Sequence, residues 1–256
     1  MWRLFVAIGA ATLGLGAIVS GAFITSAKVA LPAGQPEPSV LLHQTIGLLA
    51  IALCALFAVA GRTQRIASAI ALAALIASAA IGWNHPLSHG AASWHATTAH
   101  LFTASIAIVL ATRASSSVIP AGRFISLRPA AMATPIAVFL QIVMGALYRH
   151  EVTGILPHML GAMVVALLAM IVSAVVLQNF PHVPELKRAG ALLISVVILQ
   201  VVLGIAVFIM LLLNVSNTAS FVWTATAHAM TGTLALGASV LMAIEIRRRL
   251  VAGATA

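Results

Sequence analysis

Four histidines occupy matching places in an unusually apolar chain: His43, His100, His158 and His228. Each lies near the start of a long apolar segment, where a polar side chain is costly and tends to mark a functional site. Two neutral imidazoles on facing helices of a four-helix bundle suit a haem iron, with the flat macrocycle between them. A membrane histidine can also do no more than hydrogen-bond a neighbouring helix. Because four of them occur in step, we predict that these histidines are iron ligands.

Other uses of these histidines fit the sequence less well. A proton relay needs carboxylates, and the apolar segments contain none before Glu245, at the inner end of the last one. A zinc or copper site needs three or four ligands together, often with cysteine, and the single Cys54 is predicted to be a packing residue. His95 is a rival to His100. The remaining histidines lie in or beside polar breaks and are predicted to be solvated: His85, His89, His150 and His182.

The histidines must be positioned by membrane-spanning helices. Hydrophobic residues make up 62% of the 256 residues and charged residues only 7%, whereas a soluble domain has about a quarter charged residues. A spanning helix needs about 20 mostly apolar residues. Eight segments meet that length: Leu4–Ile24, Val40–Gly61, Ile66–Trp83, Ser93–Thr112, Pro129–Tyr148, Ile155–Leu177, Ala189–Leu213 and Ser220–Ile244. The predicted fold class is therefore an all-α integral membrane protein.

An internal repeat divides the eight helices into two halves. The segment "LQIVMGALY" at 140–148 matches "LQVVLGIAV" at 199–207, and "WHATTAHLFT" at 94–103 matches "WTATAHAMTG" at 223–232 with one residue of slippage. The alignment of the two "TAH" triplets pairs His100 with His228. We predict two pseudo-symmetric four-helix bundles, residues 1–120 and 121–256, with two of the four histidines in each.

The basic residues predict the orientation. With the N-terminus in the cytoplasm, only Lys28 and Arg149 fall on the outer side. The inner side receives Arg3, Arg62, Arg65, Arg113, Arg123, Arg128, Lys187, Arg188, Arg247, Arg248 and Arg249. This bias explains the net charge of +9 without a nucleic-acid partner. It predicts a multi-pass protein of the cell inner (plasma) membrane with both termini in the cytoplasm, and all four histidines in the outer part of the membrane.

Over essentially its whole length, the chain resembles the haem A synthase family of cytochrome oxidase assembly proteins. The most specific match is "QIVMGALYRHEVTG" leading to His158, and "QVVLG" and "TAH" with His228 fit as well. The resemblance implies that His158 and His228 ligate a resident haem b, and that His43 and His100 flank the substrate haem O. Arg149 would pair with a haem propionate, which a planar guanidinium suits.

By that resemblance the protein is an oxidoreductase that converts the haem O methyl group to the formyl of haem A. Its partners would be membrane lipid, haem O, an enzyme that makes haem O, and an electron donor.

The first half departs from the family pattern. Val40 stands where the family usually has a glutamate, Gln44 where it has an arginine, and Thr25 at the place of Arg149 in the second half. The catalytic residues are therefore unassigned. A non-catalytic bis-histidine haem b carrier or electron-transfer subunit of the same fold stays open as the alternative. A transporter is disfavoured, because no helix is visibly broken at mid-membrane.

Overall fold

The computed structural model describes residues 2–30, 37–60, 65–83, 88–111, 119–120 and 122–251. Within them lie eight long helices, α1 (Trp2–Ala30), α2 (Glu37–Ala60), α3 (Arg65–Trp83), α4 (His89–Ala111), α5 (Leu127–Arg149), α6 (Leu156–Asn179), α7 (Pro184–Leu212) and α8 (Ala219–Arg249). All eight are long and apolar enough to cross a membrane. The prediction of an all-helical, multi-pass membrane protein with eight spans is confirmed.

The helices extend beyond the apolar segments that predicted them. The α7 helix begins at Pro184 rather than Ala189, because proline suits the first helical turn and the charged residues Glu185, Lys187 and Arg188 continue the helix outside the apolar run. In the same way α8 continues past Ile244 to Arg249. Hydropathy locates the part of a helix that lies in hydrocarbon, whereas the backbone hydrogen bonds continue into the polar boundary.

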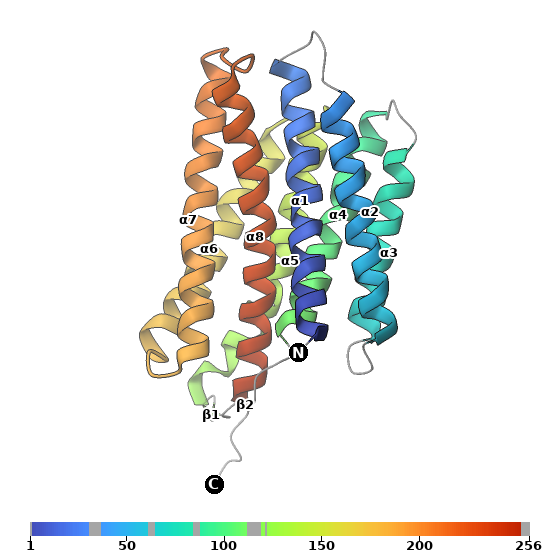
Figure 1. The fold of residues 1–256 in the computed structure, drawn as a ribbon. Helices are drawn as coiled ribbons and strands as arrows, with labels where there is room; N and C mark the ends of the chain where they lie inside the picture. The colour runs from blue at the N-terminus through green and yellow to red at the C-terminus, as the bar shows by residue number, and fades with distance from the viewer. Residues whose placement is uncertain are drawn as a thin grey trace.

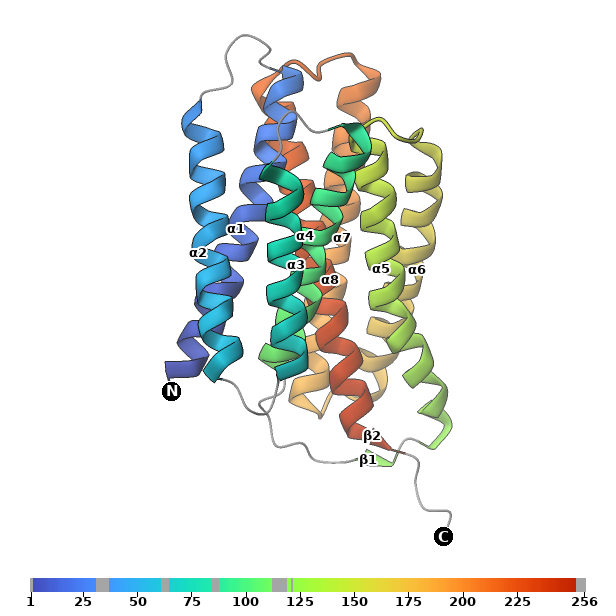
Figure 2. The same cartoon turned by 90° about the vertical axis from the view of Figure 1, so that its right-hand side faces the viewer.

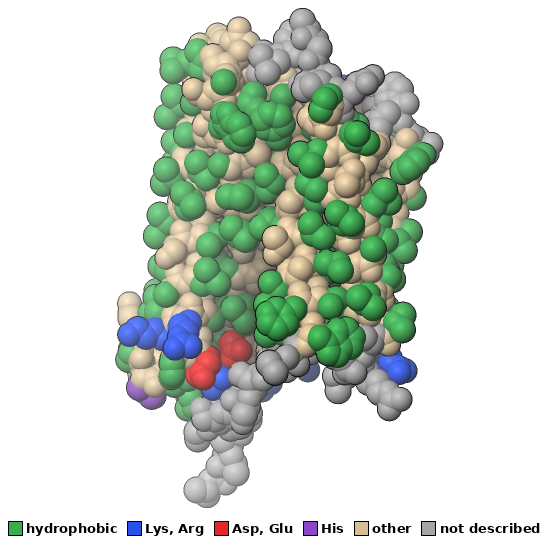
Figure 3. Space-filling model, in the orientation of Figure 1, with side chains coloured by type: hydrophobic (Ala, Val, Ile, Leu, Met, Phe, Trp, Pro, Cys, Tyr) green, Lys and Arg blue, Asp and Glu red, His purple; other side chains and the backbone are tan. Residues whose placement is uncertain are grey.

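The helices stand side by side in one bundle, with both chain ends at the same end (Figures 1 and 2). The α8 helix contacts α1, α4, α5 and α7, and α4 likewise contacts four helices, α1, α3, α5 and α8. One cluster of buried apolar residues is drawn mainly from α5–α8 and includes Leu186 and Met242, and another comes from α1–α4 and includes Phe102 and Cys54. The buried Cys54 agrees with its predicted packing role. Large apolar side chains cover the outside of the bundle (Figure 3), as a lipid-facing surface requires.

Two helices end in the same way at the end of the bundle away from the chain termini. Glu151 after α5 and Asn214 after α7 adopt positive φ, 58° and 55°. The backbone N–H of Val152 donates to Leu147 O at 2.8 Å, and that of Val215 donates to Met210 O at 3.0 Å. Both are Schellman motifs with an apolar residue after the left-handed one. They fix the turns that lead into α6 and α8.

The opposite end is closed by a short backbone pairing. Strand β1 (Ile119–Pro120) pairs in parallel with β2 (Leu250–Val251), so that Ile119 faces Leu250. The 3-10 helix Gly122–Ser126 leads from this pairing into α5. The segment that joins α4 to α5 is thereby attached to the end of α8.

Candidate functional site

The structure brings two of the predicted ligands together in the second half of the chain. The rings of His158 on α6 and His228 on α8 have centroids 6.3 Å apart and planes at 88°. Both side chains are partly buried. These two histidines are 70 positions apart in the sequence, so the contact depends on how α6 and α8 face each other.

A second imidazole pair in the first half has nearly the same geometry. The rings of His43 on α2 and His95 on α4 have centroids 6.0 Å apart and planes at 81°. The alignment of the "TAH" triplets predicted His100 as the partner of His43, and the structure places His95 there instead. His95 and His100 are five residues apart on α4, which turns their side chains about 140° from each other.

His100 has a different environment from the paired histidines. It is only 9% exposed, and its Nδ1 lies 2.7 Å from the carbonyl oxygen of Ala96 on its own helix. Among the described residues it makes no ring contact with another imidazole. The alignment of the two "TAH" triplets therefore pairs His100 with His228 in sequence, but the two histidines do not lie on equivalent faces of α4 and α8.

Each of the four paired imidazoles lies against a glycine of the helix before it. A Cβ atom built on these glycines would stand 2.6 to 3.1 Å from the ring Cε1 atom, closer than an ordinary van der Waals contact. The four pairs are Gly21 with His43, Gly82 with His95, Gly145 with His158, and Gly204 with His228. The absence of a side chain at these positions lets the ring approach the helix backbone. The recurrence of this contact identifies His95, not His100, as the fourth member of the set.

The same helices also hold one nitrogen of each ring. In every case Nδ1 lies near a polar atom of a residue one to four positions before the glycine. The contacts are Ser20 Oγ with His43 at 2.9 Å, Ser78 O with His95 at 2.7 Å, Gln141 Nε2 with His158 at 2.8 Å, and Gln200 O with His228 at 3.2 Å. In all four, Nε2 is the ring nitrogen farther from the glycine. Fixing one ring nitrogen orients the other. The contacts of His43 and His95 are with acceptors for Nδ1–H, whereas Gln141 Nε2 donates to Nδ1 of His158, and Nε2 of His228 lies 3.3 Å from Gln200 Nε2.

Two glutamines support the second-half pair. Gln141 also donates from Nε2 to the His158 carbonyl at 2.7 Å, and Thr231 donates its hydroxyl to Gln200 Oε1. Each glutamine lies against a glycine of the facing helix, Gly161 or Gly232. The Oε1 atom of Gln141 is buried without a hydrogen-bond partner in the described part of the chain. The repeated "LQ" of the sequence marks both residues, but their contact with the histidine became evident only from the structure.

The spacing of the pairs fits a metal ion held between two imidazoles. With metal–nitrogen bonds of about 2 Å and ring centres about 1.1 Å behind each nitrogen, two axial imidazoles have centroids about 6.2 Å apart. The observed values of 6.0 and 6.3 Å agree with that separation. The residues with determined placement contain no group of three or more His, Cys, Asp or Glu that would hold a metal ion. Each pair thus supplies two imidazole donors.

Arg149, the predicted propionate partner, contacts the first half of the chain. Its Nη2 donates to the carbonyl of Ala22 at 2.5 Å and to the hydroxyl of Ser26, both on α1. It thus connects the end of α5 to the same helix that carries Gly21. The side chain of Lys28, the other predicted outer cation, lies outside the described residues.

Of the remaining histidines, His89 and His182 are exposed, whereas His150 is partly buried. His89 Nδ1 lies 2.8 Å from the carbonyl oxygen of His150, next to the exposed carboxylate of Glu151 at 3.7 Å. His182 is exposed, and His85 lies outside the described residues. His89 and His182 thus agree with their predicted solvated role.

No protein-family model matches the chain, and no curated protein matches it.

Proposed function

We propose that the chain is a haem-binding membrane protein built from two four-helix halves, residues 1–120 and 121–256. One haem site lies in each half, between His43 and His95 and between His158 and His228. The observation that carries this proposal is the recurrence of one arrangement: two facing imidazoles at 6.0 or 6.3 Å, each ring against a glycine and each Nδ1 held by the preceding helix. Polar groups in hydrocarbon are costly, so the recurrence of the same histidine–glycine contact at four positions indicates that the four histidines share one role.

We further propose a haem A synthase-like oxidoreductase activity, in which the methyl group of haem O becomes the formyl group of haem A. It is supported by the resemblance carried by "QIVMGALYRHEVTG" and His158. The second-half pair would hold a resident haem b and the first-half pair the substrate haem O, with His95 taking the place first given to His100. A haem iron held by two imidazoles supplies one-electron redox chemistry.

The chain's own residues orient and shield these groups. Ser20 Oγ and the carbonyl of Ser78 can accept from Nδ1–H of His43 and His95, which leaves Nε2 of these two rings for ligation. Gln141 and Gln200 hold the rings of His158 and His228, and ligation there through Nε2 requires both glutamine amides to turn. Arg149 stands between α5 and α1 with a cationic group for a propionate, and its present contacts are a carbonyl and a hydroxyl rather than a carboxylate. Because Arg149 lies between the two halves, we propose that its position depends on the occupancy of both haem sites.

Electron transfer without porphyrin chemistry is the second candidate. The two pairs differ by only 0.3 Å in centroid separation, whereas an enzyme with a resident haem and a substrate haem is expected to have unequal sites. In addition, Val40 provides no carboxylate at the place where the family usually has one. Both features favour two equivalent, permanently occupied haem b sites.

Haem extraction after expression in a host that makes haem O separates the two candidates. Haem A in the extract supports the enzyme, and Val40→Glu is then expected to raise its yield, because a carboxylate near the methyl group can take part in proton transfer. If both the unchanged chain and Val40→Glu contain haem b alone at both sites, the result supports the electron-transfer protein. A colourless preparation from a haem-replete host contradicts both.

We also propose that the protein lies in the cell inner (plasma) membrane. The end of the bundle with the chain termini would then face the cytoplasm. The basic residues at the ends of α3, α7 and α8 support this orientation. A reporter enzyme fused after Arg249 is expected to be active only on the cytoplasmic side. Activity on the outer side would reverse the orientation.

A further inference from the structure

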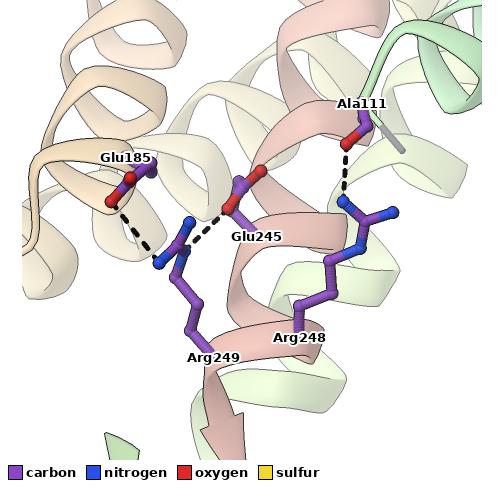
Figure 4. Close-up of polar contacts among 5 residues, drawn as sticks. All are labelled: Ala111, Glu185, Glu245, Arg248 and Arg249. Carbon is purple, nitrogen blue, oxygen red and sulfur yellow. Dashed lines mark hydrogen bonds and ion pairs between the residues drawn. The ribbon is translucent and has the colours of Figure 1, made fainter. Parts of the chain in front are cut away.

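The inner end of α8 carries its basic residues on two different sides. Arg249 is only 1% exposed and forms ion pairs with Glu245 at 2.8 Å and Glu185 at 3.4 Å (Figure 4). Arg248 turns to another side, where its Nη1 donates to the carbonyl of Ala111, the last residue of α4, at 2.5 Å (Figure 4). The guanidinium of Arg249 thus meets two carboxylates, whereas that of Arg248 meets a neutral carbonyl.

A cavity of about 340 Å³ opens on the Arg248 side. It is lined by residues of α4, α5 and α8, namely Ile108, Arg128, Ile244, Arg247 and Arg248. Its walls are mostly apolar, from the two isoleucines and the aliphatic parts of the three arginines, and none of the described residues that line it is acidic. Among the described residues, none of these three arginines has an ion-pair contact.

The chain has too few acids to neutralise this cavity from within. It contains four, Glu37, Glu151, Glu185 and Glu245. Two of them pair with Arg249, and the other two belong to the opposite end of the bundle, where α2 begins and α5 ends. The acidic side chains of this chain therefore leave the three guanidiniums open to an anion from outside it.

A neighbouring cavity contains both acidic and basic residues, so the excess of positive charge is confined to the first cavity. It measures about 220 Å³ and places Arg188 among two carboxylates, Glu185 and Glu245, and the apolar residues Ala189, Leu192 and Leu241. An inward-positive topology alone explains arginines at this end of the helices. It does not explain why they are matched by acids in one cavity and gathered without acids in the other.

We propose that the Arg128–Arg247–Arg248 cavity binds the headgroup of an anionic phospholipid. Guanidinium groups contact phosphate oxygens in a planar, bidentate way, and basic pockets between helices at the cytoplasmic boundary recognise anionic headgroups. Ile108 and Ile244 contact the glycerol and the first acyl carbons. Because the lining comes from α4, α5 and α8, the lipid bridges the two halves of the chain at their inner ends.

The test titrates the full chain, purified in detergent and delipidated, with phosphatidylglycerol, with phosphatidylcholine of the same acyl chains, and with inorganic phosphate. The readouts are the number of lipids retained in native mass spectrometry and the midpoint of thermal unfolding. We expect phosphatidylglycerol alone to be retained and to raise the midpoint. Arg128→Gln and Arg247→Gln are each expected to weaken its binding about fivefold.

The matched control is Arg188→Gln, which removes a guanidinium at the same end of the bundle but from the cavity that contains acids. It is expected to leave phosphatidylglycerol binding unchanged. Equal retention of both lipids, or an equal loss in Arg188→Gln, overturns the proposal, because either result means general adhesion to a basic surface. Protection by inorganic phosphate equal to that by phosphatidylglycerol also overturns it, in favour of a soluble anion. Arg247 is exposed and makes no side-chain hydrogen bond or ion pair within the described part of the chain, so its variant keeps the test valid if Arg128→Gln fails to fold.

Discussion

Adding one methyl group at Gly82 should remove haem from the first half of the protein. A Cβ atom at this position would stand 2.6 Å from Cε1 and 2.8 Å from Nδ1 of His95, about 0.8 Å short of the 3.4 Å at which ordinary contact begins. The contact is with the imidazole of His95, whose side chain can rotate about two bonds. To relieve it, the imidazole must move by about 0.8 Å. Metal–ligand distances tolerate only about 0.2 Å. Gly82→Ala is therefore expected to break the ligation by His95.

The other three glycines give a graded series. The corresponding distance to Cε1 is 2.9 Å at Gly145, 3.0 Å at Gly204 and 3.1 Å at Gly21. The displacement they demand falls in that order, to about 0.3 Å at Gly21, close to the tolerance of a metal–nitrogen bond. We expect Gly82→Ala to lose the most haem and Gly21→Ala the least.

The assay is the haem-to-protein ratio of each purified alanine variant, with the low-spin absorption spectrum as a second readout. Gly82→Ala should lower the ratio by about half, because only the first-half iron loses a ligand. Gly47→Ala is the matched control, since nothing lies within 4 Å of its added Cβ on α2. Because an added Cβ displaces a packed ring, the thermal unfolding midpoint of each variant is measured beside its haem content, which separates haem loss from loss of folding. A Gly82→Ala protein with the haem content of Gly47→Ala would refute the proposed role of these glycines.

Three further predictions concern single residues. His95→Ala should lose the first-half haem while His100→Ala keeps it, measured by haem content, and the reverse would restore the pairing expected from the sequence alignment. Glu151→Gly should raise the free energy of unfolding by about 0.5–1 kcal/mol, because only glycine adopts positive φ without strain, whereas Glu151→Ala should bring no gain. Arg249→Met should lower it by about 3 kcal/mol, because the buried carboxylate of Glu245 loses its partner, and adding Glu245→Gln should recover part of the loss in the same unfolding assay.

The sequence was sufficient to predict the membrane class and the number of spans. These follow from the length of each apolar segment, which depends on nothing outside that segment. It was also sufficient to single out His43, His158 and His228, because a histidine inside an apolar run is conspicuous. In the structure the rings of His158 and His228 lie next to each other, with centroids 6.3 Å apart, and their role as iron ligands stays a prediction.

The pairing in the first half could not be predicted in the same way. Both His95 and His100 lie in α4, and the choice between them depends on the rotation of α4 about its axis relative to α2. That rotation is fixed by contacts such as the approach of His95 to Gly82, between different helices, which hydropathy does not encode. The contact of Arg149 with Ala22 on α1 escaped prediction for the same reason.

The central position of α8 has a consequence for how the protein is made. This helix is synthesised last, yet it contacts α1, α4, α5 and α7, and it carries buried polar side chains such as Thr231, Ser239 and Arg249. A segment with this many polar groups is poorly soluble in lipid alone, so it needs the earlier helices to receive it as it leaves the translocon. A nascent chain that ends before Ala219 lacks the contacts of α8 with α1, α4, α5 and α7. Assembly is thus a late event of translation, and truncated chains are expected to be recognised by membrane proteases.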